Sequence, residues 1–337
     1  MAQRRYVFGG AVPPGWSASV AIDIMRSAKI RLDNRFFKTK DLVGGLIRAE
    51  NWQVRDQGER GTCNAFAVAA AEELREFNLS GKLNDLSEEY LYGKMRSYGL
   101  EPLSDIGMDV SHVDTEAIEE SGGTFLEQAR KALSEWGICS EDLAEYQKHA
   151  EENTFEDNFS ENAINQAQEN KIGESLLDHD IVSKPVVGIG KPWLRASTNR
   201  RISEVLAEKI QSGLPVAASF AVLSGTGKQA WTGRTALKFG KVEYPTDEVA
   251  KEMIAIGGHS VCLVGFVENH DPSILHGGWF VFRNSHGEDG FATSIETDEE
   301  EPKAPAAGYG LISTHDVDRY CWEYLARTSS GSGHPVF

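Results

Sequence analysis

The segment 54–66 reads VRDQGERGTCNAF, and the rest of the chain can be interpreted outward from it. Gln57 lies shortly before Cys63, and Cys63 opens a run of helix-forming residues from Asn64 to Leu79. A thiol at the N-terminus of a helix lies in a positive electrostatic field, which favours the thiolate. Because the thiolate is the nucleophilic form, we expect Cys63 to be a reactive sulfur rather than a buried structural one.

The composition of the chain limits the partners, the disulfides and the cellular location that we expect. The chain has 337 residues and a formal net charge of −17, which argues against nucleic acid and anionic membranes as partners because both need a basic surface. Its four cysteines are far apart and include no Cys-x-x-Cys, so we expect no disulfide framework. The first residues lack the apolar core of a signal peptide. We therefore expect a cytoplasmic protein, with no membrane partner.

Helical patterns dominate the first half of the chain. Ser87 is placed to cap a helix whose first turn holds Glu88 and Glu89. The other expected helices are 22–32, 64–79, 125–136 (stopped by Gly137) and 202–211. The polar stretch 145–200 is interpreted as an insertion or as surface helices.

The pattern changes after residue 213, where short apolar runs are bounded by Gly, Asn and His. These runs are predicted strands, and they cover 216–222, 260–267, 279–283 and 309–313. The segment 298–308 is charged and rich in helix and strand breakers, which predicts a loop. A helical half followed by a β-rich half indicates an α+β protein with two lobes.

A reactive thiol needs a base, and the base needs a partner that orients it. His259 begins an apolar run after two glycines, and Asn284 ends another apolar run. Both are therefore expected at the tips of core strands, where a rigid sheet can hold them. An Asn carbonyl that accepts the imidazole N–H would set the orientation and the tautomer of the ring.

Seven separated blocks, in order along the chain, resemble the sequence blocks of the papain-like cysteine peptidases. They are QGERGTCNAF at 57–66, LSEEYL at 86–91, Gly122-Gly123 with the helix after it, GLPV at 213–216, GHSV at 258–261, RNSHG at 283–287 and GYG at 308–310. The chain is similar to a bacterial-type, cytoplasmic member of that family.

The resemblance implies roles for individual residues. Cys63 corresponds to the nucleophile, and His259 to its base, which would form a thiolate–imidazolium pair with it and later act as the acid. Asn284 corresponds to the residue that orients His259. The side-chain amide of Gln57 and the backbone N–H of Cys63 would form an oxyanion hole, in which each donor contributes about 3 kcal/mol.

The resemblance also assigns Gly122 and Gly123 to substrate binding. The backbone of Gly123 would pair with an extended peptide, and a side chain there would prevent the close approach. The implied partner is a protein or peptide substrate, and no cofactor or metal is implied.

The implied fold is papain-like and two-lobed, with a helical lobe, a β-barrel-like lobe and the active-site cleft between them. We expect an N-terminal extension at 1–50 without a full-length prodomain, followed by a catalytic domain at 51–337. In that domain the helical lobe spans about 51–150, the polar insertion about 145–200 and the β lobe about 201–330.

Three residues depart from the family pattern. Arg60 stands where secreted members carry a disulfide cysteine, which agrees with a cytoplasmic protein. Asn64 replaces the Trp that usually follows the nucleophile. His286 replaces a Trp that shields the Asn–His hydrogen bond, so we expect that bond to be more hydrated here.

Several alternatives stay open. Each candidate residue could be structural, and the whole protein could be a weakly catalytic or inactive binding or regulatory protein with the same fold. The same site could also serve an isopeptidase, a transpeptidase or an amidase. A zinc site of His259 and Cys262 is disfavoured, because residues three apart on a strand face opposite sides. The acidic run 298–301 is a solvated loop or an insert that shades the active site.

Overall fold

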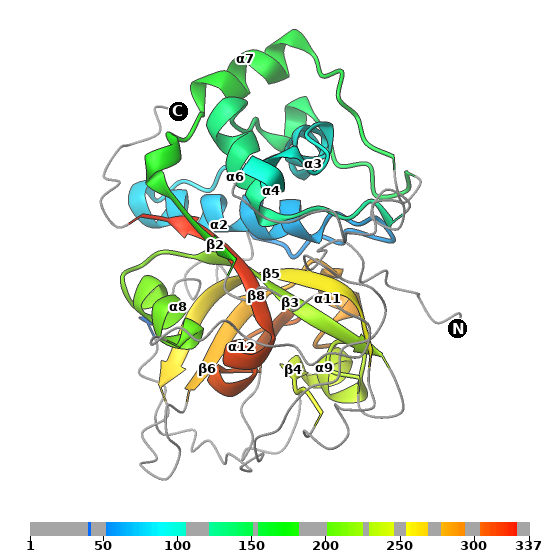
Figure 1. The fold of residues 1–337 in the computed structure, drawn as a ribbon, viewed down its shortest axis with the longest axis vertical. Helices are drawn as coiled ribbons and strands as arrows, with labels where there is room; N and C mark the ends of the chain where they lie inside the picture. Colours follow the sequence, from blue (N-terminus) through cyan, green and yellow to red (C-terminus); the bar gives the residue numbers. More distant parts are fainter. Residues whose placement is uncertain are drawn as a thin grey trace.

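The chain folds into a helical part and a sheet part that lie one above the other (Figure 1). This computed structural model describes residues 40–41, 52–105, 121–150, 154–181, 201–224, 229–245, 254–268, 278–293 and 304–328. Helices of the first half form the upper part in Figure 1, and most strands form the lower part. The expected α+β fold with two lobes is therefore confirmed.

Helix α2, Cys63–Ser80, lies at the junction of the two parts (Figure 1). Its alanines are small enough to let neighbouring elements approach on both sides. Ala70, Ala71 and Leu74 pack into the core of the sheet part, whereas Ala65 and Val68 pack into the core of the helical part. Helix α2 thus belongs to both cores.

The remaining helices agree only in part with the sequence pattern: those at 88–97, 126–135 and 202–211 were predicted, whereas those at 234–239, 287–290 and 314–320 lie in the half predicted to be β-rich. These remaining helices are α3 Glu88–Ser97, α4 Glu101–Asp105, α6 Leu126–Glu135, η2 Glu141–Leu143, α7 Glu161–Glu169, η3 Glu174–Leu176, α8 Ile202–Gln211, α9 Arg234–Phe239, α11 Gly287–Gly290 and α12 Thr314–Tyr320. The side chain of Ser87 caps α3 by accepting the N–H of Tyr90 at 2.9 Å, as predicted. None of the described helices is both long and apolar enough to cross a membrane.

One mixed sheet contains the described strands. They are β1 Lys40–Asp41, β2 Leu177–Ile181, β3 Val216–Ser224, β4 Lys241–Val242, β5 Ile254–Glu268, β6 Gly278–Arg283, β7 Tyr309–Ser313 and β8 Cys321–Arg327. The order is β2-β8-β3-β5-β6-β7-β4, and β1 pairs with β5 beside this path. Every described pair is antiparallel except β4 and β7.

The expected barrel-like lobe is not confirmed, because the sheet formed by the described strands is open. Its order begins at β2 and ends at β4, and these two strands do not pair. The bulges in β3 and β5 bend the strands without closing them into a barrel.

Some sequence predictions need correction. Strand β5 begins at Ile254 rather than at Ser260, so that His259 lies inside a long strand and not at its tip. Strands β2 and β8 were not predicted, and β2 lies within the stretch interpreted as an insertion. The helix expected at 22–32 and the acidic run 298–301 lie outside the described residues.

Candidate active site

Cys63 is the first residue of α2, as predicted, and its sulfur faces the sheet. Its Sγ accepts the backbone N–H of Ser260 on β5 at 3.4 Å. Ser260 directly follows His259, so this contact brings the predicted nucleophile and the predicted base together from the two parts of the fold.

His259 and Asn284 form the expected hydrogen bond, with the ring Nε2 2.7 Å from the Asn284 Oδ1. The same Oδ1 accepts the backbone N–H of Ser285 at 2.9 Å, which identifies it as the oxygen. The Nε2 of His259 therefore carries the proton in the neutral ring. Its Nδ1 is then the basic nitrogen.

Two rings pack against the imidazole of His259. Trp231 meets it edge-on with the centroids 4.9 Å apart, and His286 stacks on it at 4.8 Å. Asn284 and His286 are 3% and 1% exposed. The expectation that the His286 substitution leaves the Asn–His bond hydrated is therefore wrong, because the two rings and the surrounding core exclude water.

Gln57 lies beside the segment that follows Asn284. The backbone N–H of Gln57 donates to the carbonyl of Ser285 at 2.8 Å, and its side-chain oxygen accepts the Ser285 hydroxyl at 2.5 Å. Asp56 and His286 form an antiparallel bridge next to this pair. The Gln57 Nε2 donates to the carbonyl of Arg60 at 2.8 Å, which uses one of the two N–H groups of the amide.

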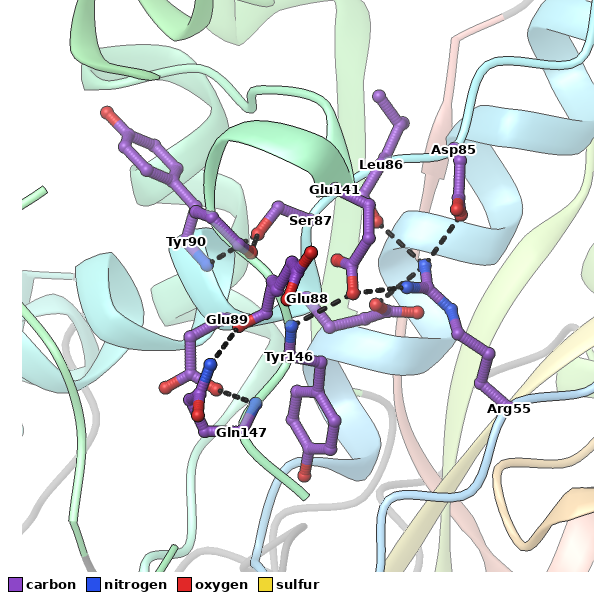
Figure 2. Close-up of polar contacts among 12 residues, drawn as sticks. Arg55, Asp85, Leu86, Ser87, Glu88, Glu89, Tyr90, Glu141, Tyr146 and Gln147 are labelled. Atoms are coloured by element: carbon purple, nitrogen blue, oxygen red, sulfur yellow. Dashed lines mark hydrogen bonds and ion pairs between the residues drawn. The ribbon is translucent and has the colours of Figure 1, made fainter. Parts of the chain in front are cut away.

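Arg55 holds the segment before Gln57 by contacts with four carboxylates around the start of α3. Figure 2 labels three of them, Asp85, Glu88 and Glu141. Its guanidinium lies 2.9 Å from Asp85, 2.7 Å from Glu88, 2.8 Å from Glu141 and 3.7 Å from Glu73. Burial raises the pKa of Glu88 well above its usual value, against the attraction of Arg55. Arg55 lies two residues before Gln57, so its ion pairs hold the backbone that leads to Gln57 beside the start of α3.

Asn64, which replaces the family's Trp, bonds to both parts of the fold. Its Nδ2 donates to the Thr124 carbonyl at 2.7 Å, and its Oδ1 accepts the hydroxyls of Ser260 and, at 3.3 Å, Ser219. Thr124 directly follows Gly122 and Gly123, so this bond brings the predicted substrate-binding glycines beside the nucleophile helix.

The segment that contains Gly122 and Gly123 also packs closely against the loop that contains Gly61. Gly122 has a φ of 67°, which favours glycine, and its carbonyl accepts the Tyr92 hydroxyl at 2.8 Å. A Cβ on Gly61 would lie 2.5 Å from the Ser121 carbonyl oxygen and 2.8 Å from atoms of Gly122. The two loops therefore approach so closely that Gly61 cannot carry a side chain without movement.

The protonation states differ from the sequence prediction. Burial raises the pKa of the Cys63 thiol to about 12, even though the Ser260 N–H favours the thiolate. Burial also lowers the pKa of His259 to about 4, against the opposing effect of its bond to Asn284. Cys63, His259 and Gln57 are 0% exposed, rather than open to a cleft. In this state the pair is a neutral thiol and a neutral imidazole, because desolvation outweighs the helix field.

Sequence reasoning missed the supporting residues Ser219, Trp231 and Thr124. No motif marks them, since each acts through a contact with a residue far away in the sequence. Among the described residues, no group of three or more His, Cys, Asp or Glu side chains could hold a metal ion.

Comparison with known proteins gives no match by sequence but clear similarity by fold. No protein-family model matches the chain. No curated protein matches it either. The fold is similar to that of xylellain, a cysteine protease from Xylella fastidiosa, with a TM-score of 0.56, 18% identity and coverage of 97% of this chain and 99% of xylellain.

Two further solved structures are similar at lower scores. One is digestive procathepsin L 3 of Tenebrio molitor larval midgut, with a TM-score of 0.48, 16% identity and coverage of 96% of this chain and 77% of that chain. The other comes from work on the mite allergens Blo t 1 and Der p 1, with a TM-score of 0.43, 16% identity and coverage of 92% and 75%. The similarity to xylellain shows that the chain has the papain-like α+β fold.

Proposed function

We propose that this chain is a thiol peptidase in which Cys63 is the nucleophile, His259 the base and Asn284 the residue that orients it. One observation carries the proposal: the Cys63 sulfur contacts the residue next to His259, while His259 is hydrogen-bonded to Asn284 at 2.7 Å. The papain-like fold, shared with the cysteine protease xylellain, supports this reaction class.

The chemistry follows from these positions. In the open site His259 Nδ1 takes the thiol proton, the Cys63 thiolate then attacks a peptide carbonyl, and the new C–S bond leaves the charge on the carbonyl oxygen. Gln57 Nε2 and the Cys63 backbone N–H donate to that oxygen. The tetrahedral intermediate then collapses, and His259 gives its proton to the leaving amine. Water, deprotonated by His259, hydrolyses the thioester on Cys63 and regenerates the thiol.

The burial of the three site residues limits the access of a substrate to them. Since Cys63, His259 and Gln57 are fully buried, substrate entry requires that the site opens. Opening would hydrate the site and so remove the desolvation that disfavours both ions. The thiolate–imidazolium pair expected from the sequence is therefore proposed for the open state, with an extended peptide paired to the backbone of Gly123.

We also propose that the protein acts in a reducing compartment such as the cytoplasm. Its four cysteines are free, and Arg60 stands where a disulfide cysteine would be expected. Cleavage of an isopeptide bond would use the same acyl-enzyme, so the nature of the bond is decided by substrate profiling.

The test is the variant Cys63→Ala. It should abolish turnover of a peptide library and labelling by an epoxysuccinyl inhibitor, because the Cys63 sulfur is the proposed nucleophile in both reactions. Cys139→Ala is the matched control, since it removes another buried thiol from the helical part and should leave both readouts intact. Full labelling in the Cys63→Ala protein would refute the assignment, and a wild type that cleaves neither peptides nor an isopeptide substrate would favour a binding or regulatory role.

A further inference from the structure

His179 on β2 lies between two buried carboxylates. Its Nδ1 is 2.9 Å from Glu127 on α6, and its Nε2 is 2.8 Å from Glu323 on β8. The side chains of His179, Glu127 and Glu323 are 6%, 1% and 0% exposed. These three residues, called the His179 cluster below, join three elements that are far apart in the sequence.

Glu323 also holds the start of α6. Its two carboxylate oxygens accept the backbone N–H groups of Leu126 and Glu127, each at 3.0 Å. These N–H groups have no partner within the helix, and an anion at this end is favoured by the helix dipole. A strand of the sheet part therefore caps a helix of the helical part.

When His179 is protonated, the charges of the cluster and of Arg130 together balance, because two cations then face two carboxylates. Glu127 also pairs with Arg130 on α6 at 2.6 Å, and Arg130 reaches Glu174 on η3. Burial alone would disfavour a charged ring, but the bonds to Glu127 and Glu323 outweigh it and raise the pKa of His179 to about 9. A neutral ring would leave an excess of negative charge in a nearly dry space, and only one ring nitrogen could then donate.

The first turn of α6 leads directly back to the site. Leu126 follows Gly122, Gly123 and Thr124 by two to four residues. The Thr124 carbonyl accepts Asn64, and the Gly122 carbonyl accepts Tyr92, so the glycine segment is held at both carbonyls and, at its end, by the capped helix. Its position therefore depends on where α6 begins.

We propose that His179 is a positioning residue that, through Glu323 and the first turn of α6, holds Gly122 and Gly123 in place for an extended peptide substrate. This inference rests on the proposed peptidase function. It concerns the binding of substrate, not the chemical step, because the His179 cluster contacts neither Cys63 nor His259.

The test is His179→Gln, which keeps a polar side chain of moderate size but is neutral at every pH. Asp178→Asn is the matched control, since Asp178 is the neighbouring residue on β2 and pairs with Lys209 on α8 instead of with α6. The first readout is hydrogen exchange of the Leu126 and Glu127 amides at pH 7. His179→Gln should speed their exchange roughly tenfold, and Asp178→Asn should not, while α3 stays protected in both variants as evidence of folding.

The second readout separates substrate binding from chemistry. For His179→Gln at pH 7, KM should rise roughly tenfold with kcat nearly unchanged, which corresponds to about 1.4 kcal/mol. In the wild type KM should rise as the pH passes 9, whereas in His179→Gln this rise should be absent. Unchanged amide exchange, or a loss confined to kcat, overturns the proposal. Failure of the peptidase function itself is distinguishable, because it appears as an inactive wild type.

Discussion

Asn64, in the first turn of the nucleophile helix α2, is fully buried, and its amide group bonds to both parts of the fold. Nδ2 donates to the carbonyl and, at 3.1 Å, to the hydroxyl of Thr124, while Oδ1 accepts from Ser260. An amide is suited to this place because it offers donors on one side and an acceptor on the other. Asn64 thus forms a polar bridge between the two parts of the fold.

Replacement of this amide should therefore be costly. Asn64→Leu has a similar volume but leaves the Thr124 carbonyl without its donor, so the free energy of unfolding should fall by about 1–3 kcal/mol. Urea denaturation at pH 7 measures this loss. Ser219→Ala is the control and should cost less, since Ser260 keeps its bond to Asn64. Equal losses in the two variants would contradict the bridging role.

The loop before α2 and the helix α3 are joined by a buried ion pair where a disulfide cysteine would be expected. Arg60 and Glu89 meet through two hydrogen bonds of 2.5 and 2.9 Å, and their side chains are 1% and 4% exposed. The guanidinium also donates to the carbonyls of Gln147 and Thr154 at 3.1 and 3.0 Å. Arg60 thus connects three segments without a covalent bond.

Removal of one partner of this ion pair should lower the free energy of unfolding more than removal of both partners. Arg60→Met leaves the Glu89 carboxylate buried without its cation and should cost about 3–5 kcal/mol of unfolding free energy. The double variant Arg60→Met with Glu89→Met should recover much of this loss, because no charge then stays buried. Lys131→Met is the control, since it breaks a more exposed pair with Asp105 and should cost under about 1 kcal/mol. A double variant less stable than Arg60→Met would contradict the expectation.

For the molecule as a whole, buried histidines have pKa values shifted in opposite directions: burial lowers the pKa of His259 and of its neighbour His286, whereas the pKa of His179 is raised. His259 has a pKa lowered to about 4 by burial, so the unfolded chain binds more protons than the folded one between about pH 4 and 6.5. Its contribution to stability is present above pH 6.5 and is lost as the pH falls. The pKa of His179 is raised to about 9 by its two carboxylates, against the effect of burial. Its contribution is present below pH 6.5 and is lost as the pH rises through 9.

Stability differences between variants should reveal the two effects separately. The advantage of the wild type over His179→Gln should shrink by on the order of 3 kcal/mol from pH 6.5 to 9, and its advantage over His259→Gln should shrink similarly from pH 6.5 to 4. The difference in unfolding free energy between the wild type and a variant is the proper measure. The titration of Glu88, whose pKa is raised by burial, changes the stability of both proteins alike and so cancels in this difference. Chemical denaturation at pH 4, 6.5 and 9 tests both expected changes. A pH-independent difference for either variant would contradict its assigned shift.

The predicted elements agree best with the structure where local signals are complete. Helix α8 spans Ile202–Gln211 as predicted, and Ser87 caps α3 through the predicted bond. Strand β2, with the sequence LDHDI, was missed because its charged residues are unfavourable in a buried strand unless they have partners. Those partners are Lys209, Glu127 and Glu323, which no local pattern connects to β2.

The order and spacing of the sequence blocks were sufficient to predict the α+β class, the cysteine at the start of a helix and the pairing of a histidine with an asparagine. Helix caps, apolar periodicity and short motifs depend on neighbours along the chain, so they can be read from it directly. Only the tertiary structure decided that the sheet is open, that the site is closed to water, and that Cys63 and His259 are neutral there. Burial and charge depend on residues brought together from distant segments, and desolvation in that shared interior outweighs the local helix field.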